Sequence, residues 1–311
     1  MKFLTPNFWL QKNISLISIV LFPIAMLLQL LRVLKKELTQ KKIYEQPVIC
    51  IGNIYLGGTG KTPLSIKVYE LLTKKLKKKI CIVRKNYKNH QDEHSLIKSK
   101  IKNFYVDNSR VKAIDSAIEN KCEVIILDDG YQDYSIKKNL NIICFNSDQL
   151  IGNGLTIPSG PLRESLYNIK NCQIVIVNGE KNKKFEKKLK KINKNLQIFY
   201  SYYKLKNSKK LKKKKYIAFA GIGNPQNFFK LLKKNKIFLA KTFSFPDHYN
   251  YKKIDIEFLK QKAKENRSNL LTTQKDYLRL NKFYKFKLDF SDIELRLNNE
   301  KLFLSILKRY I

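Results

Sequence analysis

The residues best suited to chemistry form the run Gly57-Gly58-Thr59-Gly60-Lys61-Thr62. This run follows an apolar stretch at 47–51 and precedes a helical pattern at 64–76. A strand, a glycine-rich turn and a helix in this order direct backbone N–H groups and a helix N-terminus at one point, which is typical of a phosphate-binding loop. Such a loop places Lys61 at the β- and γ-phosphates of a nucleotide and the Thr62 hydroxyl at Mg²⁺. A glycine-rich turn that only ends a strand is the alternative.

A second group of polar residues follows the apolar stretch 123–127 and reads Asp128-Asp129-Gly130. A buried strand that ends in carboxylates delivers them to the carboxyl edge of the sheet, where nucleotide sites lie in such folds. Asp128 is the candidate acid on the Mg²⁺ side, and Asp129 lies behind it or orients the substrate. Alone, the same three residues could form a plain turn.

Two further clusters contain histidine. Gln91-Asp92-Glu93-His94 follows the second predicted strand, and residue types alone favour a surface loop there. Phe245-Pro246-Asp247-His248-Tyr249 places a histidine among aromatic side chains beside an aspartate. A lone loop histidine is usually structural or exposed, but these neighbours also suit a role in a cleft.

Short apolar runs alternate with helical patterns along the chain, which predicts an α/β fold of the P-loop NTPase type: a mostly parallel sheet with helices on both faces. We expect a kinase domain at 41–208 and a smaller C-terminal α/β domain at 209–311 that closes over the active site. A lysine-rich linker is predicted at 204–215, and a terminal amphipathic helix at 299–307. The strands are predicted at 47–51, 79–83, 104–106, 123–127, 140–145, 173–177, 216–220, 237–243 and 269–273.

Residues 1–40 are expected to form a membrane-associated helix. The stretch 13–31 carries no charge, is rich in Leu and Ile, and is just long enough to span a bilayer. Trp9 before it and Arg32, Lys35 and Lys36 after it are typical interfacial anchors. This pattern fits a single span or a helix lying in the membrane surface, and a hydrophobic core helix is the alternative.

The net charge is +38, yet only eight of the 63 basic residues are arginine. This lysine bias indicates an AT-rich genome more than a nucleic-acid surface, and we find no nucleic-acid-binding module. The positive field still attracts anionic substrates and lipid headgroups. The cysteines, none of them in a Cys-x-x-Cys pair, sit in or beside apolar runs and are expected to be small buried hydrophobes: Cys50, Cys81, Cys122, Cys144 and Cys172.

Taken together, the motifs resemble the tetraacyldisaccharide 4'-kinase family, the lipid A 4'-kinases of Gram-negative bacteria. The resemblance covers almost the whole chain, and the order and spacing of its segments make it specific. The segments are Trp9, Gly52-Asn53 through Thr62-Pro63, Asp92-Glu93, Asp128-Asp129-Gly130-Tyr131-Gln132, Gly152-Asn153-Gly154, Pro158 through Glu164, Asn178-Gly179, Gly221 through Pro225, Phe245 through His248 and Thr272 through Asp276.

The resemblance implies phosphoryl transfer from Mg-ATP to the 4'-hydroxyl of an acylated glucosamine disaccharide 1-phosphate, which gives lipid IV-A. It places the enzyme at the cytoplasmic face of the bacterial inner membrane. It implies that Asp92 is the catalytic carboxylate, that His248 from the other predicted domain is its partner, and that closure of the two domains brings them together. Lys61 and Arg163 would neutralise phosphate charge, Thr62 and Asp128 would hold Mg²⁺, and Asp129, Gln132 and Glu164 would line or support the substrate site.

The chain departs from the family pattern in places. Asp133 replaces the usual histidine after Asp-Asp-Gly-aromatic-Gln, and Arg84-Lys85-Asn86-Tyr87 replaces a glycine-rich segment. Tyr55 also occupies the first glycine position of the phosphate-loop pattern. A regulatory membrane ATPase or GTPase remains an alternative, although Asn281-Lys282 lacks the aspartate that guanine recognition requires. A nucleic-acid-binding protein would explain the charge alone.

Overall fold

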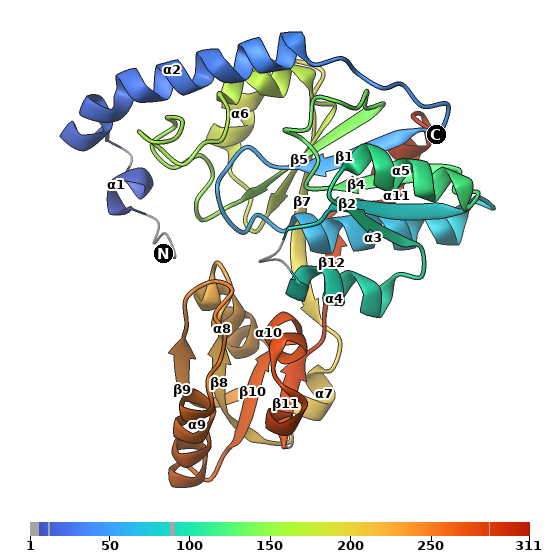
Figure 1. Cartoon of the computed structure of the whole chain (residues 1–311). Helices are drawn as coiled ribbons and strands as arrows, with labels where there is room; N and C mark the ends of the chain where they lie inside the picture. The colour runs from blue at the N-terminus through green and yellow to red at the C-terminus, as the bar shows by residue number, and fades with distance from the viewer. Residues whose placement is uncertain (1–5, 12, 88–90, 286) are drawn as a thin grey trace. The chain divides into compact units, whose positions relative to one another are not determined.

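The computed structural model describes residues 6–11, 13–87, 91–285 and 287–311 (Figure 1). The chain folds into two compact units, each of which is described by itself. Unit 1 contains residues 1–86, 101–202 and 296–311, and unit 2 contains residues 87–100 and 203–295. The chain therefore passes more than once between the two units.

The larger sheet has the strand order β12-β7-β6-β5-β1-β4-β2-β3, and the strands from β1 to β7 pair in parallel. β1, β4 and β6 are short apolar runs whose residues are buried almost throughout, as expected for parallel strands covered on both faces. The strands are β1 Val48–Gly52, β2 Ile80–Lys85, β3 Phe104–Asp107, β4 Val124–Asp128, β5 Leu140–Asn146, β6 Ile174–Asn178, β7 Gln197–Leu205 and β12 Ile293–Leu297.

Helices cover this sheet on both faces. Val48 and Cys50 of β1 belong to a core cluster that includes side chains of α5 (Arg110–Glu119) and α6 (Lys183–Ile192), next to the short helix η1 (Leu166–Asn171). The helix α3 (Lys61–Lys75) packs over β1, β2 and β4 outside that cluster. Lys67 of α3 forms an ion pair of 2.7 Å with Glu300, the first residue of α11 (Glu300–Lys308), so the end of the chain returns to unit 1.

The N-terminal helices α1 (Asn7–Leu10) and α2 (Leu16–Leu38) dock on unit 1. Trp9 Nε1 donates to the Pro158 carbonyl (2.9 Å), and Asn153 Nδ2 donates to the Ser18 hydroxyl (3.2 Å). Ser18 and Ala25, seven positions apart and therefore on one helix face, are buried, while most other side chains of α2 are exposed. By length and composition, α2 is the one described helix that could cross a membrane.

Unit 2 is built on a smaller, fully parallel sheet with the order β11-β10-β8-β9. Its strands are β8 Lys215–Ala220, β9 Phe238–Ser244, β10 Asn269–Thr273 and β11 Leu288–Ser291. Its helices are α4 Gln91–Lys100, α7 Ser208–Leu211, α8 Pro225–Lys234, α9 Lys253–Glu265, α10 Gln274–Arg279 and the 3₁₀ turn η2 Lys282–Tyr284.

A buried carboxylate organises the loops at the carboxyl edge of this smaller sheet. Asp276, at the start of α10, accepts hydrogen bonds from the Gly221 N–H (3.1 Å), the Tyr251 hydroxyl (3.2 Å) and the Thr273 hydroxyl (2.6 Å). Because these donors lie after β8, after β9 and at the last residue of β10, one side chain joins all three segments. Burial raises the pKa of Asp276 above its usual range, against the lowering effect of the Thr273 hydroxyl and Arg279.

The structure confirms the predicted fold class and differs in its details. The segment 91–94 is the start of helix α4 and not a surface loop, and α4 belongs to unit 2. The predicted linker at 204–215 contains the end of β7, the helix α7 and the start of β8. Strands β7, β11 and β12 were not predicted, because exposed or half-buried tyrosine, lysine and charged residues interrupt the short apolar runs by which the other strands were recognised.

The terminal helix is present as α11, but it lies in unit 1 and not with the C-terminal unit. All five cysteines are buried and none of them forms a disulfide, as expected. The segment that replaces the family's glycine-rich turn runs into residues 88–90, which lie outside the described part of the chain.

Candidate active site

The phosphate-binding loop connects β1 to α3 in the predicted place. Gly60 has φ +88°, a left-handed conformation that glycine adopts without strain, and α3 begins at the next residue, Lys61. The Asn53 side chain braces the loop through hydrogen bonds to the carbonyls of Tyr55 (2.6 Å) and Gly57 (3.3 Å). Tyr55 is itself buried, so the residue that replaces the first glycine of the motif packs in the core beneath the loop.

Asp128, the last residue of β4, is the centre of the site and is completely buried. Its carboxylate accepts hydrogen bonds from the hydroxyls of Thr62 (3.1 Å) and Ser65 (2.8 Å) on α3. Arg84, at the end of β2, donates to the same carboxylate (2.5 Å) and to the Thr62 hydroxyl (3.1 Å). The predicted pair Thr62 and Asp128 is therefore brought together, and a buried arginine joins it.

Asp129 lies next to several cationic side chains. Its carboxylate lies 3.6 Å from Lys61 Nζ and 3.4 Å from Arg163 Nη1. Burial raises the pKa of Asp129, but the positive charges of the nearby cations lower it by more: Lys61, Arg163, Arg84 and Arg110. The pKa of Asp129 therefore lies below its usual range, and the group is ionised at neutral pH. Asp129 also has φ +56°, which the fold holds in place by a hydrogen bond from Arg110 to its carbonyl (2.5 Å).

The remaining predicted residues of this region support the loops around the site. Gln132 donates to the Asn53 carbonyl (2.8 Å) and accepts from Arg163 (3.5 Å). Glu164 is buried, and its two oxygens accept from the Tyr134 hydroxyl (3.0 Å) and Asn168 (2.7 Å). Glu164 therefore holds a loop in place here, and Gln132 and Arg163 link that loop to the phosphate-binding loop.

Asp133, at the position of the family's histidine, forms an ion pair with Arg110 (3.0 Å) and accepts from Ser135. Burial raises its pKa, but the hydrogen bonds from Ser135 and Arg110 lower it below the usual range. Asp133 thus anchors the arginine that holds the Asp129 carbonyl, so the departure from the family pattern is accommodated by a charged partner.

The other two predicted catalytic residues lie together in unit 2. Asp92 is in the first turn of α4, although its side chain lies outside the described part of the structure, and His248 follows β9. The expectation that they come from different domains is wrong, because α4 packs with unit 2 against α10. Domain closure is therefore not needed to place both residues in one unit.

Sequence analysis missed the roles of Arg84, Ser65 and Arg110. One signal for Arg84 was present, since a charged residue closed an otherwise apolar strand. The parallel register pairs Val83 with Leu127, which places Arg84 beside Asp128. The hydroxyl of Ser65 lies one helical turn after Lys61, and no local pattern distinguishes it from other serines on a helix.

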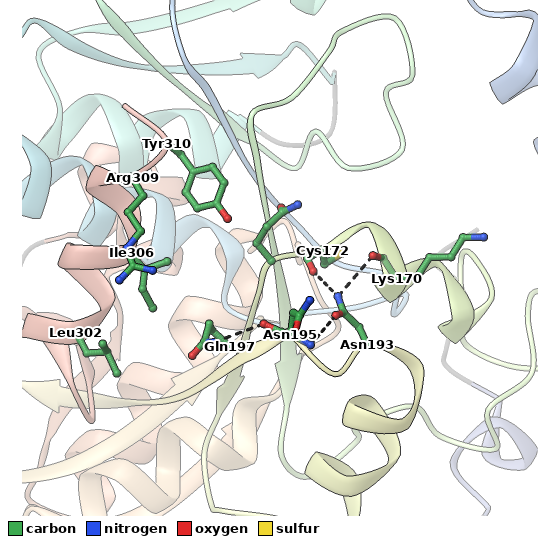
Figure 2. A pocket seen from close by; sticks show the side chains of 10 residues that line it. Lys170, Cys172, Asn193, Asn195, Gln197, Leu302, Ile306, Arg309 and Tyr310 are labelled. Carbon is green, nitrogen blue, oxygen red and sulfur yellow. Dashed lines mark hydrogen bonds between the residues drawn. The ribbon is translucent and has the colours of Figure 1, made fainter.

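A cavity of about 580 Å³ lies elsewhere in unit 1. Its walls include Gln173 before β6 and Gln197 at the start of β7, which are the amino ends of parallel strands, whereas Asp128 lies at a carboxyl end. Figure 2 shows Ile306 of α11 and Tyr310 after it on one side of this cavity and Asn193 and Asn195 on the other. The cavity is therefore at the opposite edge of the sheet from the candidate active site.

Comparisons with known proteins show the family of this chain. A family model described as tetraacyldisaccharide-1-P 4'-kinase matches residues 17–311. The chain is 39% identical over 306 residues to the tetraacyldisaccharide 4'-kinase of Pelagibacter ubique, an alignment that covers 97% of this chain and 96% of that protein. It is 34% identical to the corresponding protein of Rickettsia typhi, with 97% of each chain covered.

The chain belongs to the tetraacyldisaccharide 4'-kinase family. Its fold is also similar to the crystal structure of the "apo" form of LpxK from Aquifex aeolicus in complex with ATP, with a TM-score of 0.73 and 24% identity over 95% of this chain and 99% of that one.

The low pKa of Asp129 predicts how stability depends on pH. Because the pKa is lower in the folded chain than the value of about 3.9 in the unfolded chain, the ionised carboxylate stabilises the fold above that value, and this contribution is lost as the pH falls through the folded pKa. We expect Asp129→Asn to lower the free energy of unfolding at pH 7, with the difference from the wild type shrinking towards pH 3. Urea unfolding across this range measures it.

Asp148→Asn is the matched control, since Asp148 is an exposed acid in the same unit. The difference in free energy of unfolding between the wild type and Asp129→Asn could instead stay constant from pH 7 to pH 3. That result would show that the surrounding cations do not act on this carboxylate.

Proposed function

We propose that this chain transfers the γ-phosphoryl group of ATP to the 4'-hydroxyl of a tetraacyldisaccharide 1-phosphate, forming lipid IV-A in lipid A biosynthesis. The observation that carries the proposal is the bonding of Thr62 to Asp128 beneath a phosphate-binding loop, in a chain of this kinase family. The solved structure of similar fold contains ATP, which supports the choice of nucleotide.

The residues of unit 1 suit the binding of a magnesium nucleotide. Among the described residues, the buried Thr59 hydroxyl has no hydrogen-bond partner, and a nucleotide phosphate is an acceptor that would satisfy it. Thr62 and Asp128 supply the hydroxyl and carboxylate oxygens that Mg²⁺ prefers, and would hold the ion together with phosphate oxygens and water. When bound, Mg²⁺ neutralises charge that develops on the phosphates.

The cations near Asp129 have a defined part in this proposal. Lys61 and Arg163 are held by one carboxylate, so their charges are oriented before the nucleotide arrives. Preorganised cations of this kind stabilise a transferring phosphoryl group without reorganising during the reaction. Gln132 and Glu164 keep Arg163 and its loop in place.

The acceptor side of the reaction is assigned to unit 2. Asp92 would accept the proton of the 4'-hydroxyl, and His248 would orient Asp92 or share that proton, because an aspartate alone is a weak base near neutral pH. Positioning and electrostatics provide most of the catalysis in phosphoryl transfer, so these residues act mainly by orientation.

The lipid substrate is reached from the membrane surface, at the cytoplasmic face of the inner membrane where ATP is present. Trp9, Ser18 and Ala25 tie α1 and α2 to unit 1 along one face, and the rest of the α2 surface exposes aliphatic side chains such as Ile19, Leu27 and Leu30. A helix held lengthwise by its own protein is not free to cross a bilayer. α2 therefore lies in the plane of the interface with its apolar face in the lipid.

Activity is tested with γ-labelled ATP and the tetraacyldisaccharide 1-phosphate in detergent micelles. We expect the wild-type chain to label the lipid and Lys61→Ala to lower kcat by about 100-fold or more, because a preorganised charge at the phosphates is lost. Lys75→Ala, at the exposed end of the same helix, is the matched control and should keep full activity. If the wild-type chain leaves the lipid unlabelled, the proposed kinase function is wrong. If Lys61→Ala keeps full activity, the proposed role of the phosphate-binding loop is wrong.

Membrane binding is tested by flotation with anionic vesicles at high salt. The triple variant Ile19→Gln, Leu27→Gln, Leu30→Gln should bind at least about 100-fold more weakly, since each buried aliphatic side chain contributes about 1.5–3 kcal/mol. The control replaces exposed apolar residues of unit 2, Phe238→Gln and Ile254→Gln, and should float like the wild type. If the triple variant floats as well as the control, another part of the chain anchors it.

A further inference from the structure

The helix α6 of unit 1 presents a surface made of lysine. Six of its ten residues are lysine and all six are exposed, whereas Phe185 and Leu189 are buried in the core of the unit. The acid of this helix, Glu186, accepts from the Tyr200 hydroxyl (2.8 Å) and lies 4.0 Å from Lys181, which precedes the helix. The exposed lysines form what we call the α6 lysine face: Lys183, Lys184, Lys187, Lys188, Lys190 and Lys191.

The charges of the α6 lysine face repel one another. Lys183 and Lys187 are four positions apart, as are Lys187 and Lys191, and like charges at this spacing destabilise a helix. Within the described part of the chain, no carboxylate forms an ion pair with any lysine of this face. A dense positive surface without internal partners attracts a negatively charged surface, and docking on such a surface would relieve the repulsion.

A short series of contacts connects α6 to the apolar helix α2. α6 packs against η1, and Asn168 of η1 donates to one oxygen of Glu164 (2.7 Å). The other oxygen of Glu164 accepts from the Tyr134 hydroxyl (3.0 Å). Burial and Glu164 raise the pKa of Tyr134, and the positive charge of Arg32 on α2 opposes them, so Arg32 lies near this hydroxyl. The α6 lysine face therefore belongs to the same region of unit 1 as α2.

The helix η1 between them exposes residue types that are common at a membrane interface. Tyr167 is 60% exposed, and Lys170 Nζ lies 4.6 Å from the centre of its ring. Tyrosine is enriched where proteins meet lipid headgroups, because its amphipathic ring suits that level, and lysine is attracted to anionic headgroups. η1 thus adds an interfacial aromatic residue and one more cation to the α6 lysine face.

We propose that the α6 lysine face, together with Tyr167 and Lys170, is a second membrane-binding surface that recognises the phosphate groups of anionic phospholipids. This inference rests on the membrane position of α2 in the proposed function, and it adds the charge of the lipid to that contact. Nucleic acid carries the same phosphate chemistry, but continuity with the apolar α2 favours lipid. α6 and η1 also contain no arginine, a residue common on nucleic-acid-binding surfaces.

The test measures how tightly the full chain binds two kinds of vesicle, phosphatidylcholine alone and phosphatidylcholine mixed with phosphatidylglycerol. The wild type should bind the anionic vesicles more tightly, and the difference should shrink as salt is added. The triple variant Lys183→Gln, Lys187→Gln, Lys191→Gln should bind the anionic vesicles about 100-fold more weakly and the neutral vesicles like the wild type. Glutamine is a good helix former and removes the repulsion, so the variant keeps its fold.

The matched control removes the same charge from an exposed helix of unit 2, with Lys230→Gln, Lys233→Gln and Lys234→Gln on α8, and should bind both vesicles like the wild type. Hydrogen exchange adds a local measurement. The amides of α6 should exchange more slowly on anionic than on neutral vesicles, and those of α8 should exchange at the same rate on both.

Equal losses in the two triple variants would show that the net charge of +38 attracts the membrane as a whole, and would overturn the proposal. The proposal also fails if the α6 variant loses binding to a DNA duplex but keeps its binding to anionic vesicles. A wild type that binds neutral and anionic vesicles equally overturns the α6 surface alone. A wild type that binds neither vesicle overturns the membrane position of α2 in the proposed function, and the α6 surface with it.

Discussion

The Asp128 carboxylate joins three elements of unit 1 at a single buried point, and the candidate nucleotide site is built outward from it. Thr62 and Ser65 attach it to the first turns of α3, and Arg84 attaches it to the end of β2. Removing one partner of a buried ion pair typically lowers the stability of a protein by about 3–5 kcal/mol. The ion pair between Asp128 and Arg84 therefore holds these elements together in the folded chain. The result is that the start of α3, and with it the phosphate-binding loop, has one position relative to the sheet.

Unit 2 shows the same principle with different residues. Asp276 joins the segments after β8 and β9 to the end of β10. On the same short helix, Arg279 donates to the Tyr249 carbonyl next to His248, and Lys275 contacts the His248 ring. Because α4 is fastened to α10 through Glu93, the residues assigned to the acceptor lie within one unit. On the proposed assignment, each unit would preorganise one half of a reaction in which orientation and charge do most of the catalysis.

Much of this architecture could be predicted from sequence. The phosphate loop and Asp128 lie where a strand, a turn and a helix predict them, because the carboxyl ends of parallel strands meet at one edge. Longer-range choices could not be predicted: α4 has few apolar residues to indicate which core it joins, and β12 and α11 return to unit 1 through pairings that no local pattern specifies. Arg84 was visible as a charge at a strand end, but its partner depended on the register of β2 with β4.

The central claim is that unit 1 binds the nucleotide while Asp92 and His248 of unit 2 act together on the acceptor. A double-mutant cycle tests it most directly, with kcat and the Kd for ATP measured for Asp92→Ala, His248→Ala and the double variant. We predict that each single variant loses kcat by orders of magnitude with ATP binding unchanged, and that the double variant is scarcely worse than the worse single one, because residues that act as a unit are non-additive. A double variant whose defect equals the product of the single defects, or a loss of ATP binding in either single variant, would contradict the account.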